Sequence, residues 1–422
     1  MQSTTGQSPH SHLIVLLQGP VGPFFDQLQT YLKEKGYRVE RFVFHSGDRF
    51  FSGNRCTRFE GTLVEWEQCF TDYLDQYQPA CVVCFGSERP AHKVARSLAK
   101  QRNIPLLSLE EGYIRPGFVT VEEGGNNANS PLAGQLPENN FDRAVVKPDI
   151  HHVVNYRSFN RMGYYAILYY VIRTFFSSSI SRELYHRRFF PPAEVFYWLR
   201  NGYRKLFHRG ADNPTIHRLL EYYPEQYFLV PLQVAADSNL QQAAQGWDSP
   251  RLITSLITSF AASAPKHCRL VFKVHPLERG HNRYEREIQE IAEQQGIADR
   301  VDLIDTGSMG LLARHAAGMI TINSTSGLSA IHHGIPVLLV GKGLYEHASL
   351  AVCGEGKPDF DRFWHYSEHY ERVAPAAFRH RYLDWIRHNA LVKGDFYHPD
   401  GMSVACTGVH HKIEQVIAIS DI

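Results

Sequence analysis

The chain of 422 residues contains 43% hydrophobic and 21% charged residues, a globular composition that excludes an intrinsically disordered chain. Its length exceeds that of one ordinary hydrophobic core, so we expect two domains of α/β size. The formal net charge of +1 gives no overall field that would attract nucleic acid, and we expect no nucleic-acid partner.

The N-terminal segment and the cysteines indicate the cellular compartment. Residues 1–12 are polar and are expected to form a disordered tail without the apolar centre of a signal peptide. Cys81 and Cys84 lie in the apolar stretch 80–85, where strand alternation points them to opposite faces. We expect both to pack as small apolar groups, with a redox pair as the alternative. Since no disulfide framework is indicated, we predict a cytoplasmic protein.

Residues 13–150 alternate between strand-like and helix-like patterns, which indicates a first Rossmann-like domain. Its expected elements are strand 13–17, helix 24–36, strand 37–44, helix 63–77, strand 80–85 and strand 104–109. No glycine motif of the dinucleotide-binding or P-loop type follows the first strand. Arg89 and His92 follow strand 80–85 and are candidates for contacting an anionic ligand. The alternative is an ordinary loop arginine and a histidine at a helix start.

Two adjacent glutamates, Glu110 and Glu111, follow strand 104–109 and precede Gly112. Open α/β sheets bind their ligands at the carboxyl ends of such strands. Adjacent positions of an extended chain point to opposite faces, so one glutamate faces a cleft while the fold holds the other. The alternative is an acidic turn in which both glutamates are solvated and the glycine supplies a positive φ.

Aromatic and basic residues interleave in segment 151–215, which is expected to be a helical insertion. Rings at the headgroup level and cations on anionic lipid are what a membrane-surface element needs. The alternative is a helical layer whose tyrosines pack internally. The apolar run 162–176 is short for a membrane span and carries Arg173.

The α/β alternation restarts at residue 216 and continues to residue 385, which indicates a second Rossmann-like domain. Its expected elements are strand 227–232, helix 251–262, strand 270–274, helix 286–295, strand 301–304, strand 318–322 and strand 336–340. Residues 386–422 are expected to form helices that pack back across the domains.

Polar residues follow two strands of this second domain. Segment 323–329 offers backbone N–H groups and the hydroxyls of Ser324, Thr325 and Ser326 at a helix start, which favours a phosphate site. A single N-cap serine is the alternative. His275 follows strand 270–274 with an imidazole that can donate to a phosphate, and Pro276 fixes the loop after it.

Four motifs together resemble those of one family. They are Glu110-Glu111-Gly112-Tyr113-Ile114-Arg115-Pro116, Pro231-Leu232-Gln233, Lys273-Val274-His275-Pro276-Leu277-Glu278-Arg279-Gly280 and Asn323-Ser324-Thr325-Ser326-Gly327-Leu328-Ser329-Ala330. They are similar to the capsular polysaccharide biosynthesis family of KpsS/KpsC-type retaining β-Kdo transferases, nearest its single-domain KpsS type. The resemblance covers roughly residues 80–345. It implies a GT-B-like fold, with two Rossmann-like domains facing a cleft.

The resemblance also implies a role for each matching residue. Glu111 would be the nucleophile and Glu110 its support, although relatives often carry aspartate at the second acidic position. The residues implied in nucleotide binding are His275, Pro276, Ser324, Thr325, Ser326 and Lys273. The residues expected to contact substrate are Arg115, Arg279, Arg89, His92 and Gln233.

The implied reaction moves Kdo from CMP-Kdo to a phospholipid acceptor of the lyso-phosphatidylglycerol type, or to its Kdo linker. Retention needs two inversions, which a carboxylate nucleophile and a covalent intermediate supply. The scheme needs no cofactor and no metal. The acceptor implies a peripheral location on the inner face of the cytoplasmic membrane, with other capsule synthesis and export proteins as partners.

Three other functions stay open at this point. A non-catalytic capsule assembly or export protein would keep the fold and the nucleotide site. An inverting, sialyltransferase-like CMP-sugar transferase would use Glu111 as a general base. A sugar-nucleotide epimerase shares the two-domain architecture but more often uses a UDP-sugar.

Overall fold

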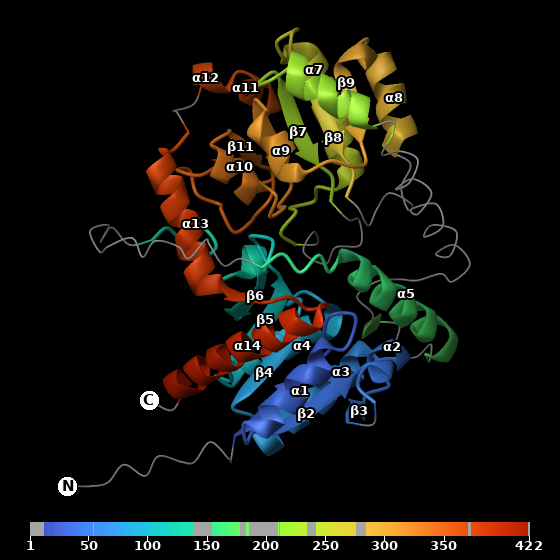
Figure 1. Cartoon of the computed structure of the whole chain (residues 1–422), viewed down its shortest axis with the longest axis vertical. Helices are drawn as coiled ribbons and strands as arrows, with labels where there is room; N and C mark the ends of the chain where they lie inside the picture. Colours follow the sequence, from blue (N-terminus) through green and yellow to red (C-terminus); the bar gives the residue numbers. More distant parts are fainter. Residues whose placement is uncertain are drawn as a thin grey trace, which may run out of the picture. The chain divides into compact units, whose positions relative to one another are not determined.

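The computed structural model describes residues 12–53, 55–137, 154–177, 183–184, 210, 212–233, 242–275, 284–369 and 373–420. The chain forms two compact units, each built on its own sheet (Figure 1). Unit 1 comprises Met1–Pro131, Asn140–Phe189 and Ile386–Ile422, and unit 2 comprises Leu132–Asn139 and Phe190–Trp385. The predicted α/β class with two Rossmann-like sheets is confirmed.

The sheet of unit 1 has the strand order β13-β6-β5-β4-β1-β2-β3. The five strands β5, β4, β1, β2 and β3 run parallel to one another. Strand β6 is antiparallel to both of its neighbours, β5 and β13. Its strands are β1 Leu13–Leu16, β2 Arg38–Val43, β3 Thr57–Arg58, β4 Cys81–Phe85, β5 Leu106–Glu111, β6 Phe118–Glu123 and β13 Leu391–Lys393. The segment 386–422 was expected to be helical throughout, and that expectation is wrong at β13, which pairs with β6 at the edge of the sheet.

Helices cover both faces of this sheet. They are α1 Phe24–Glu34, α2 Ser46–Phe50, α3 Leu63–Tyr77, α4 Pro90–Gln101, α5 Phe159–Phe176 and α14 Pro399–Ser420. One face packs against α1 and α14, and the other packs against α3 and α4. Helix α3 has the bounds that the sequence predicts, because Thr62 and Glu65 form a reciprocal capping box at its start.

The two cysteines of β4 separate between these faces, as predicted. Cys81 belongs to the core under α1 and α14, and Cys84 belongs to the core under α3 and α4. Burial raises the pKa of the Cys84 thiol to about 12, so it stays protonated and apolar in character. All seven cysteines of the chain are free thiols.

Helix α5 is the longest described part of the predicted helical insertion. It packs on α2, where the Ser46 hydroxyl donates to Ile172 O at 3.1 Å. Tyr169 and Arg173 are buried on this side. The basic residues at positions 187, 188, 204 and 205 lie outside the described residues. Within the described part of the chain, no helix is both long and apolar enough to cross a membrane.

The sheet of unit 2 is parallel throughout, with the strand order β12-β11-β10-β7-β8-β9. Its strands are β7 Tyr227–Pro231, β8 Arg269–Lys273, β9 Val301–Ile304, β10 Gly318–Thr321, β11 Val337–Leu339 and β12 Val352–Cys353. Its helices include α7 Ser249–Ser263, α8 Tyr284–Gln294, α9 Met309–Arg314, α10 Gly327–His333, α11 Phe360–Trp364, α12 Tyr366–His369 and most of α13 Ala376–Ala390. Alternate residues of β7, Phe228 and Val230, join the core under α7, α8 and α11.

Candidate active site

The carboxyl end of β5 carries the two predicted glutamates. Glu111 keeps 30% of its side chain exposed, and its Oε1 accepts a hydrogen bond from Tyr397 Oη at 2.7 Å. Burial, reinforced by the charge of Glu111, raises the pKa of Tyr397 far above its usual value, so the phenol stays a donor. Arg115 Nη2 lies 3.9 Å from Glu111 Oε2. The arrangement provides a carboxylate that is held on one oxygen and accessible to solvent.

The two glutamates have different surroundings, as alternation along β5 requires. Glu111 lies on the side of Tyr397, whose ring belongs to the core under α14. Glu110 instead acts electrostatically on Tyr113. Both roles stay predictions, but the separation into two environments agrees with a division of labour between them.

Gly112 allows the sharp bend that follows. A Cβ at this position would lie 2.3 Å from the backbone oxygen of Phe118. The φ of Gly112 does not lie in the left-handed region. Gly117, at the other end of the turn, has a left-handed φ of 82°. The turn therefore needs this glycine for close backbone approach and not for a positive φ. The hydroxyl of Thr120 fixes the bend by donating to Glu111 O at 3.1 Å and accepting from Tyr113 N at 3.2 Å.

A third carboxylate, which the sequence did not single out, is buried behind this bend. Glu122 on β6 is 4% exposed and accepts hydrogen bonds from Tyr113 Oη and Ser130 Oγ, both at 2.5 Å. Desolvation raises the pKa of Glu122 to about 7, although its hydrogen bonds act in the opposite direction. The same Tyr113 hydroxyl accepts from Asn127 N. This network ties the bend to the loop after β6.

Arg89 and His92, predicted to contact an anionic ligand, lie at the start of α4. Arg89 is 8% exposed and donates to Gly19 O at 3.0 Å. His92 is fully buried and donates from Nδ1 to Gly86 O at 2.9 Å. Burial lowers the pKa of His92 to about 3, so the ring is neutral. Contact of either residue with substrate stays a prediction, and for His92 the ring would first have to become accessible.

In unit 2, the turn between β10 and α10 contains the predicted hydroxyl cluster. Ser324 Oγ accepts from Ser326 N at 3.2 Å and lies 3.1 Å from Ser326 Oγ. Ser326 precedes α10 but makes no capping hydrogen bond with its side chain. The alternative of a single capping serine therefore does not describe this turn. The Thr325 hydroxyl has no hydrogen-bond partner among the residues that the structure describes.

Two buried residues, Gln233 and Tyr345, fix this turn by hydrogen bonds to Asn323 and Ser324. Gln233, at the end of β7, donates to Asn323 Oδ1 at 2.7 Å and accepts from Asn323 N at 3.0 Å. Tyr345 donates to Ser324 O at 2.6 Å from a buried position. A Cβ on Gly327 would lie 2.1 Å from Tyr345 Oη, so only glycine leaves room for this ring. Gln233 is thus a support of the turn, and its contact with substrate stays a prediction.

The end of β8 supplies the remaining predicted residues of unit 2. Lys273 is 6% exposed and donates to Thr306 O at 3.1 Å, beyond the end of β9. His275 is half-buried two residues further on. Because β7, β8 and β10 are parallel, their carboxyl ends lie at one edge of the sheet. Pro276 and Arg279 lie outside the described residues.

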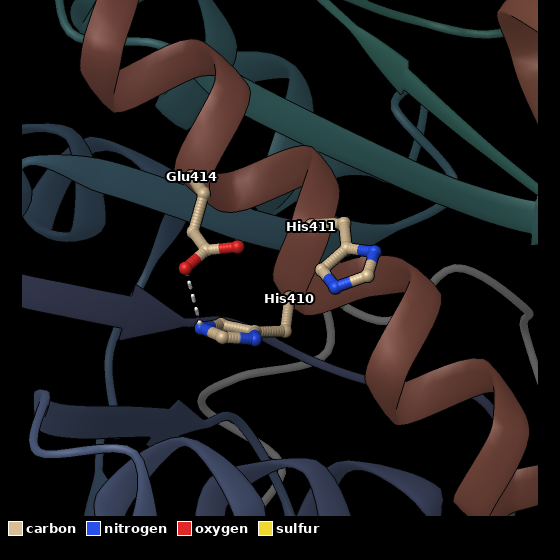
Figure 2. A group of neighbouring side chains, drawn as sticks. All are labelled: His410, His411 and Glu414. Carbon is tan, nitrogen blue, oxygen red and sulfur yellow. Dashed lines mark ion pairs between the residues drawn. The ribbon is translucent and has the colours of Figure 1, made fainter.

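Helix α14 carries a group of side chains with the composition of a metal site. The ligand atoms of His410, His411 and Glu414 lie within 4.8 Å of one another (Figure 2). The ring of His410 packs edge-on against Tyr31 and Tyr37, with centroids 5.8 and 5.6 Å apart. Burial lowers the pKa of His410. Packing thus accounts for the buried histidine, while His411 and Glu414 are exposed, and we assign the group no metal.

Two Rossmann-like sheets, each with polar residues at the carboxyl ends of parallel strands, define an α/β protein of the class whose ligands commonly bind at such sheet edges. The family model described as "Capsule polysaccharide biosynthesis protein" matches residues 80–397. The chain is 34% identical to the capsule polysaccharide export protein KpsS of Escherichia coli over 83% of this chain and 89% of that protein. The chain therefore belongs to the capsule polysaccharide biosynthesis family, as the four motifs predict.

Other similar proteins include the capsule polysaccharide modification protein LipB of Neisseria meningitidis, 28% identical over 91% of each chain. Among solved structures, KpsC of Thermosulfurimonas dismutans, a β-Kdo 2,7-transferase, aligns with 97% of this chain and 99% of that chain. The identity is 12% and the TM-score is 0.43. UDP-GlcNAc 2-epimerase from Neisseria meningitidis aligns with 96% and 100% of the two chains, at 12% identity and a TM-score of 0.34. The family assignment rests on the sequence matches.

Proposed function

We propose that this protein is a retaining glycosyltransferase of capsule biosynthesis that transfers Kdo from CMP-Kdo. Its acceptor is a phospholipid of the lyso-phosphatidylglycerol type, or the Kdo linker on such a lipid. The observation that carries the proposal is Glu111, a carboxylate on a strand end with one oxygen held by Tyr397 and the other facing Arg115. The family to which the chain belongs supports the capsule pathway.

In the proposed mechanism, Glu111 attacks the anomeric carbon of the donor sugar while the bond from that carbon to the phosphate oxygen breaks. CMP leaves with the bonding electrons, and a glycosyl ester forms on Glu111. An acceptor hydroxyl then attacks the same carbon from the opposite face, loses its proton to solvent and releases the Glu111 carboxylate. Two inversions give net retention. Arg115 is placed to attract the carboxylate of the sugar, being 63% exposed beside Glu111.

The proposed CMP contacts lie in unit 2. The departing phosphate is an anion, so donors stabilise its release better than a general acid would. Backbone and hydroxyl donors of Ser324, Thr325 and Ser326, together with His275 and Lys273, supply such a surface. Gln233 accepts from Asn323 N and Tyr345 donates to Ser324 O, and these bonds support the assignment because they fix the backbone of the turn before any ligand binds. No cofactor enters the scheme.

CMP should stabilise the protein through this site. At about 100 times its Kd, a ligand adds about 2.7 kcal/mol to the stability of the state that binds it. We therefore expect CMP to raise the melting temperature, UDP to raise it less and His275→Ala to remove the CMP response. His267→Ala, at an exposed histidine of the same unit, should respond like the unchanged protein. Equal shifts with CMP and UDP in differential scanning fluorimetry would contradict the nucleotide assignment.

We further propose that the protein works on the inner face of the cytoplasmic membrane, where a lipid acceptor lies. Helix α5 supports this location through apolar side chains that point away from its buried side. Tyr164, Ile167 and Phe175 are 63%, 51% and 72% exposed, and their spacing places them on one face. Such a stripe suits insertion at the headgroup level.

Replacing Tyr164, Ile167 and Phe175 together with serine should weaken binding to anionic liposomes at least tenfold. Each large apolar side chain contributes about 1.5 kcal/mol or more when it leaves water. Sedimentation with phosphatidylglycerol vesicles measures the effect, and binding of the unchanged protein should fall with added salt. Val64→Ser is the control, since Val64 is 75% exposed on α3. Wild-type sedimentation of the triple variant would exclude α5 as the lipid contact.

A second candidate function is favoured by the name of the Escherichia coli relative, an export protein. A non-catalytic export or assembly partner would keep the nucleotide site but would not consume CMP-Kdo. Incubation with CMP-Kdo and a lyso-phosphatidylglycerol, followed by mass analysis of the lipid, separates the two functions. Added Kdo supports the transferase, while unchanged donor and lipid support the export partner.

A further inference from the structure

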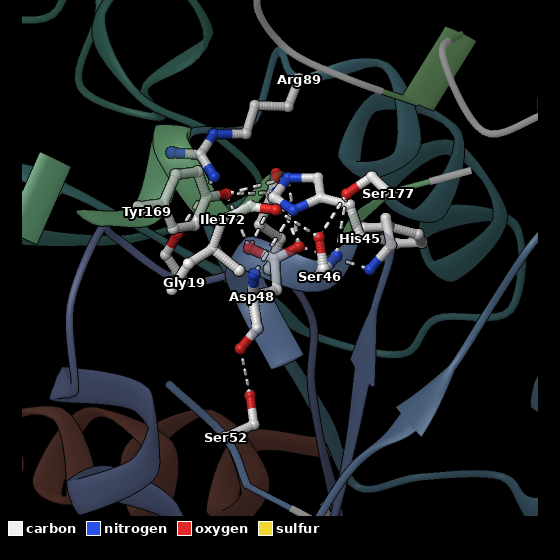
Figure 3. Close-up of polar contacts among 11 residues, drawn as sticks. Gly19, His45, Ser46, Asp48, Ser52, Arg89, Tyr169, Ile172 and Ser177 are labelled. Carbon is white, nitrogen blue, oxygen red and sulfur yellow. Dashed lines mark hydrogen bonds and ion pairs between the residues drawn. The ribbon is translucent and has the colours of Figure 1, made fainter. Parts of the chain in front are cut away.

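A buried polar cluster occupies the carboxyl ends of β1 and β2 in unit 1 (Figure 3). Gln18 follows β1, His45 and Asp48 follow β2, and Tyr169 reaches the cluster from α5. Arg89, which follows β4, points its guanidinium toward the same region (Figure 3). Because β4 is the neighbour of β5, this cluster and Glu111 share one edge of the sheet.

The carboxylate at the centre of this cluster is already satisfied by neutral donors. Asp48 accepts from Gln18 Nε2 at 2.9 Å, from Tyr169 Oη at 2.7 Å and from Phe44 N at 3.3 Å. Burial lowers the pKa of His45 to about 4, so this ring adds no charge near pH 7. The carboxylate oxygens of Asp48 thus already accept hydrogen bonds from three neutral donors.

The positive charges around it are more numerous. Arg41 is 3% exposed on β2, Arg89 is 8% exposed and Arg173 is 2% exposed on α5. Arg41 feels the charge of Asp48, while Arg89 and Arg173 act electrostatically on His45. Arg41 and Arg89 also approach the same ring: Arg41 lies over Phe25, and the Gly19 whose oxygen accepts from Arg89 packs directly against Phe25.

Arg41 and Arg89 have no carboxylate within ion-pair distance among the residues that the structure describes. Within these residues, Arg41 Nε and Nη1 are buried without a hydrogen-bond partner. Arg41 instead lies over the ring of Phe25, at 5.8 Å from its centroid. Burying a charge without a counter-charge is strongly unfavourable, so such an arrangement persists where a ligand uses it.

We propose that Arg41 and Arg89 form a binding site for the oxyanion of a phosphate ester at this sheet edge. A guanidinium presents paired N–H donors that match two phosphate oxygens, and its delocalised charge is weakly hydrated. The site rests on the proposed function, in which the acceptor lipid carries a phosphodiester head group. It assigns recognition of that head group to unit 1, separately from the CMP phosphate in unit 2.

Titration calorimetry on the full chain tests the site with four probes. They are glycerophosphoglycerol, a short-chain lyso-phosphatidylglycerol, inorganic phosphate and a monoacylglycerol without phosphate. Both phosphodiesters should bind, the monoacylglycerol should not, and Arg41→Gln should weaken phosphodiester binding at least tenfold. Arg38→Gln is the control on the same strand, because the Arg38 side chain is 58% exposed. Binding of inorganic phosphate alone, dependent on Arg41, would keep the site and assign it to free phosphate.

The stability of the ligand-free variant distinguishes a binding role from a structural one. If Arg41 serves a ligand, Arg41→Gln removes an unpaired buried charge and should leave the melting temperature unchanged or raise it. A marked fall in melting temperature would indicate a structural residue. Arg89→Gln then provides the second variant, and wild-type phosphodiester affinity in it would overturn the proposal.

Failure of the site and failure of the proposed function give different results. If Kdo transfer occurs but Arg41→Gln leaves the KM for the acceptor unchanged, the site is wrong and the transferase stands. If CMP-Kdo is no substrate but phosphodiester binding depends on Arg41, the site stands and the transferase is wrong.

Discussion

Glu111→Gln should abolish Kdo transfer while leaving CMP binding intact. The glutamine amide has the size of the carboxylate but cannot attack the anomeric carbon, so we expect kcat to fall about a thousandfold or more. The proposed phosphate contacts belong to unit 2, and the CMP-induced rise in melting temperature should therefore match that of the unchanged protein. Activity near the wild-type level in Glu111→Gln would refute the assignment of the nucleophile.

Two neighbouring variants serve as graded controls. Glu110→Gln should be only partly impaired, because alternation along β5 places this side chain on the other side of the strand. Tyr397→Phe removes one hydrogen bond to Glu111 and should slow the reaction less than loss of the carboxylate does. Peptide mapping of slow variants incubated with CMP-Kdo should locate a sugar ester on Glu111. An inverted product would make Glu111 a general base instead.

Local patterns predicted the elements that position these residues. The apolar run 104–109 predicted a strand followed by two glutamates; β5 is present but includes both glutamates, because it begins at Leu106 and ends at Glu111. Helix α3 has the bounds of the predicted helix 63–77, and the capping box of Thr62 and Glu65 explains its start. The hydroxyl-rich stretch 323–329 predicted the turn before α10. In each case the deciding information lies within a few residues of the element.

Contacts between distant parts of the chain were not predictable in this way. Tyr397 lies 286 residues beyond Glu111, and no local pattern links a tyrosine after β13 to a carboxylate on β5. Tyr345 is similar, because its ring reaches Ser324 through tertiary packing. A small signal exists at Gly327, which directly follows three hydroxyl residues at the predicted helix start; the Tyr345 ring leaves no room for a side chain at this position.

The environment of Glu122 was likewise not predictable from its local sequence, and this carboxyl group should make the stability of unit 1 depend strongly on pH. In sequence it is one of two adjacent glutamates at the end of a strand, like Glu110 and Glu111. Its antiparallel strand directs it into the protein, where Tyr113, Ser130 and Asn126 surround the carboxyl group. Burial raises its pKa from the usual 4.5 to about 7. Folding therefore favours its protonated form between these two values.

The sign of the resulting pH dependence follows from proton binding. Between pH 4.5 and 7 the folded protein holds a proton on Glu122 that the unfolded chain has released, so stability falls as pH rises through this window. The loss should reach about 3 kcal/mol, at 1.36 kcal/mol per pKa unit. Glu122→Gln should match the unchanged protein near pH 4.5 and exceed its stability at pH 8.

Hydrogen exchange of the peptide covering residues 106–123, measured in urea from pH 4.5 to 8, reports the opening of unit 1 without interference from unit 2. The difference between the unchanged protein and Glu122→Gln isolates this one group, because all other titrations cancel. Glu123→Gln is the matched control. The Glu123 side chain is exposed, so its replacement should leave the dependence of stability on pH unaltered. If the difference between unchanged protein and Glu122→Gln were the same at every pH, Glu122 would be ionised throughout, and the Tyr113 and Ser130 hydroxyls would then be stabilising a buried charge.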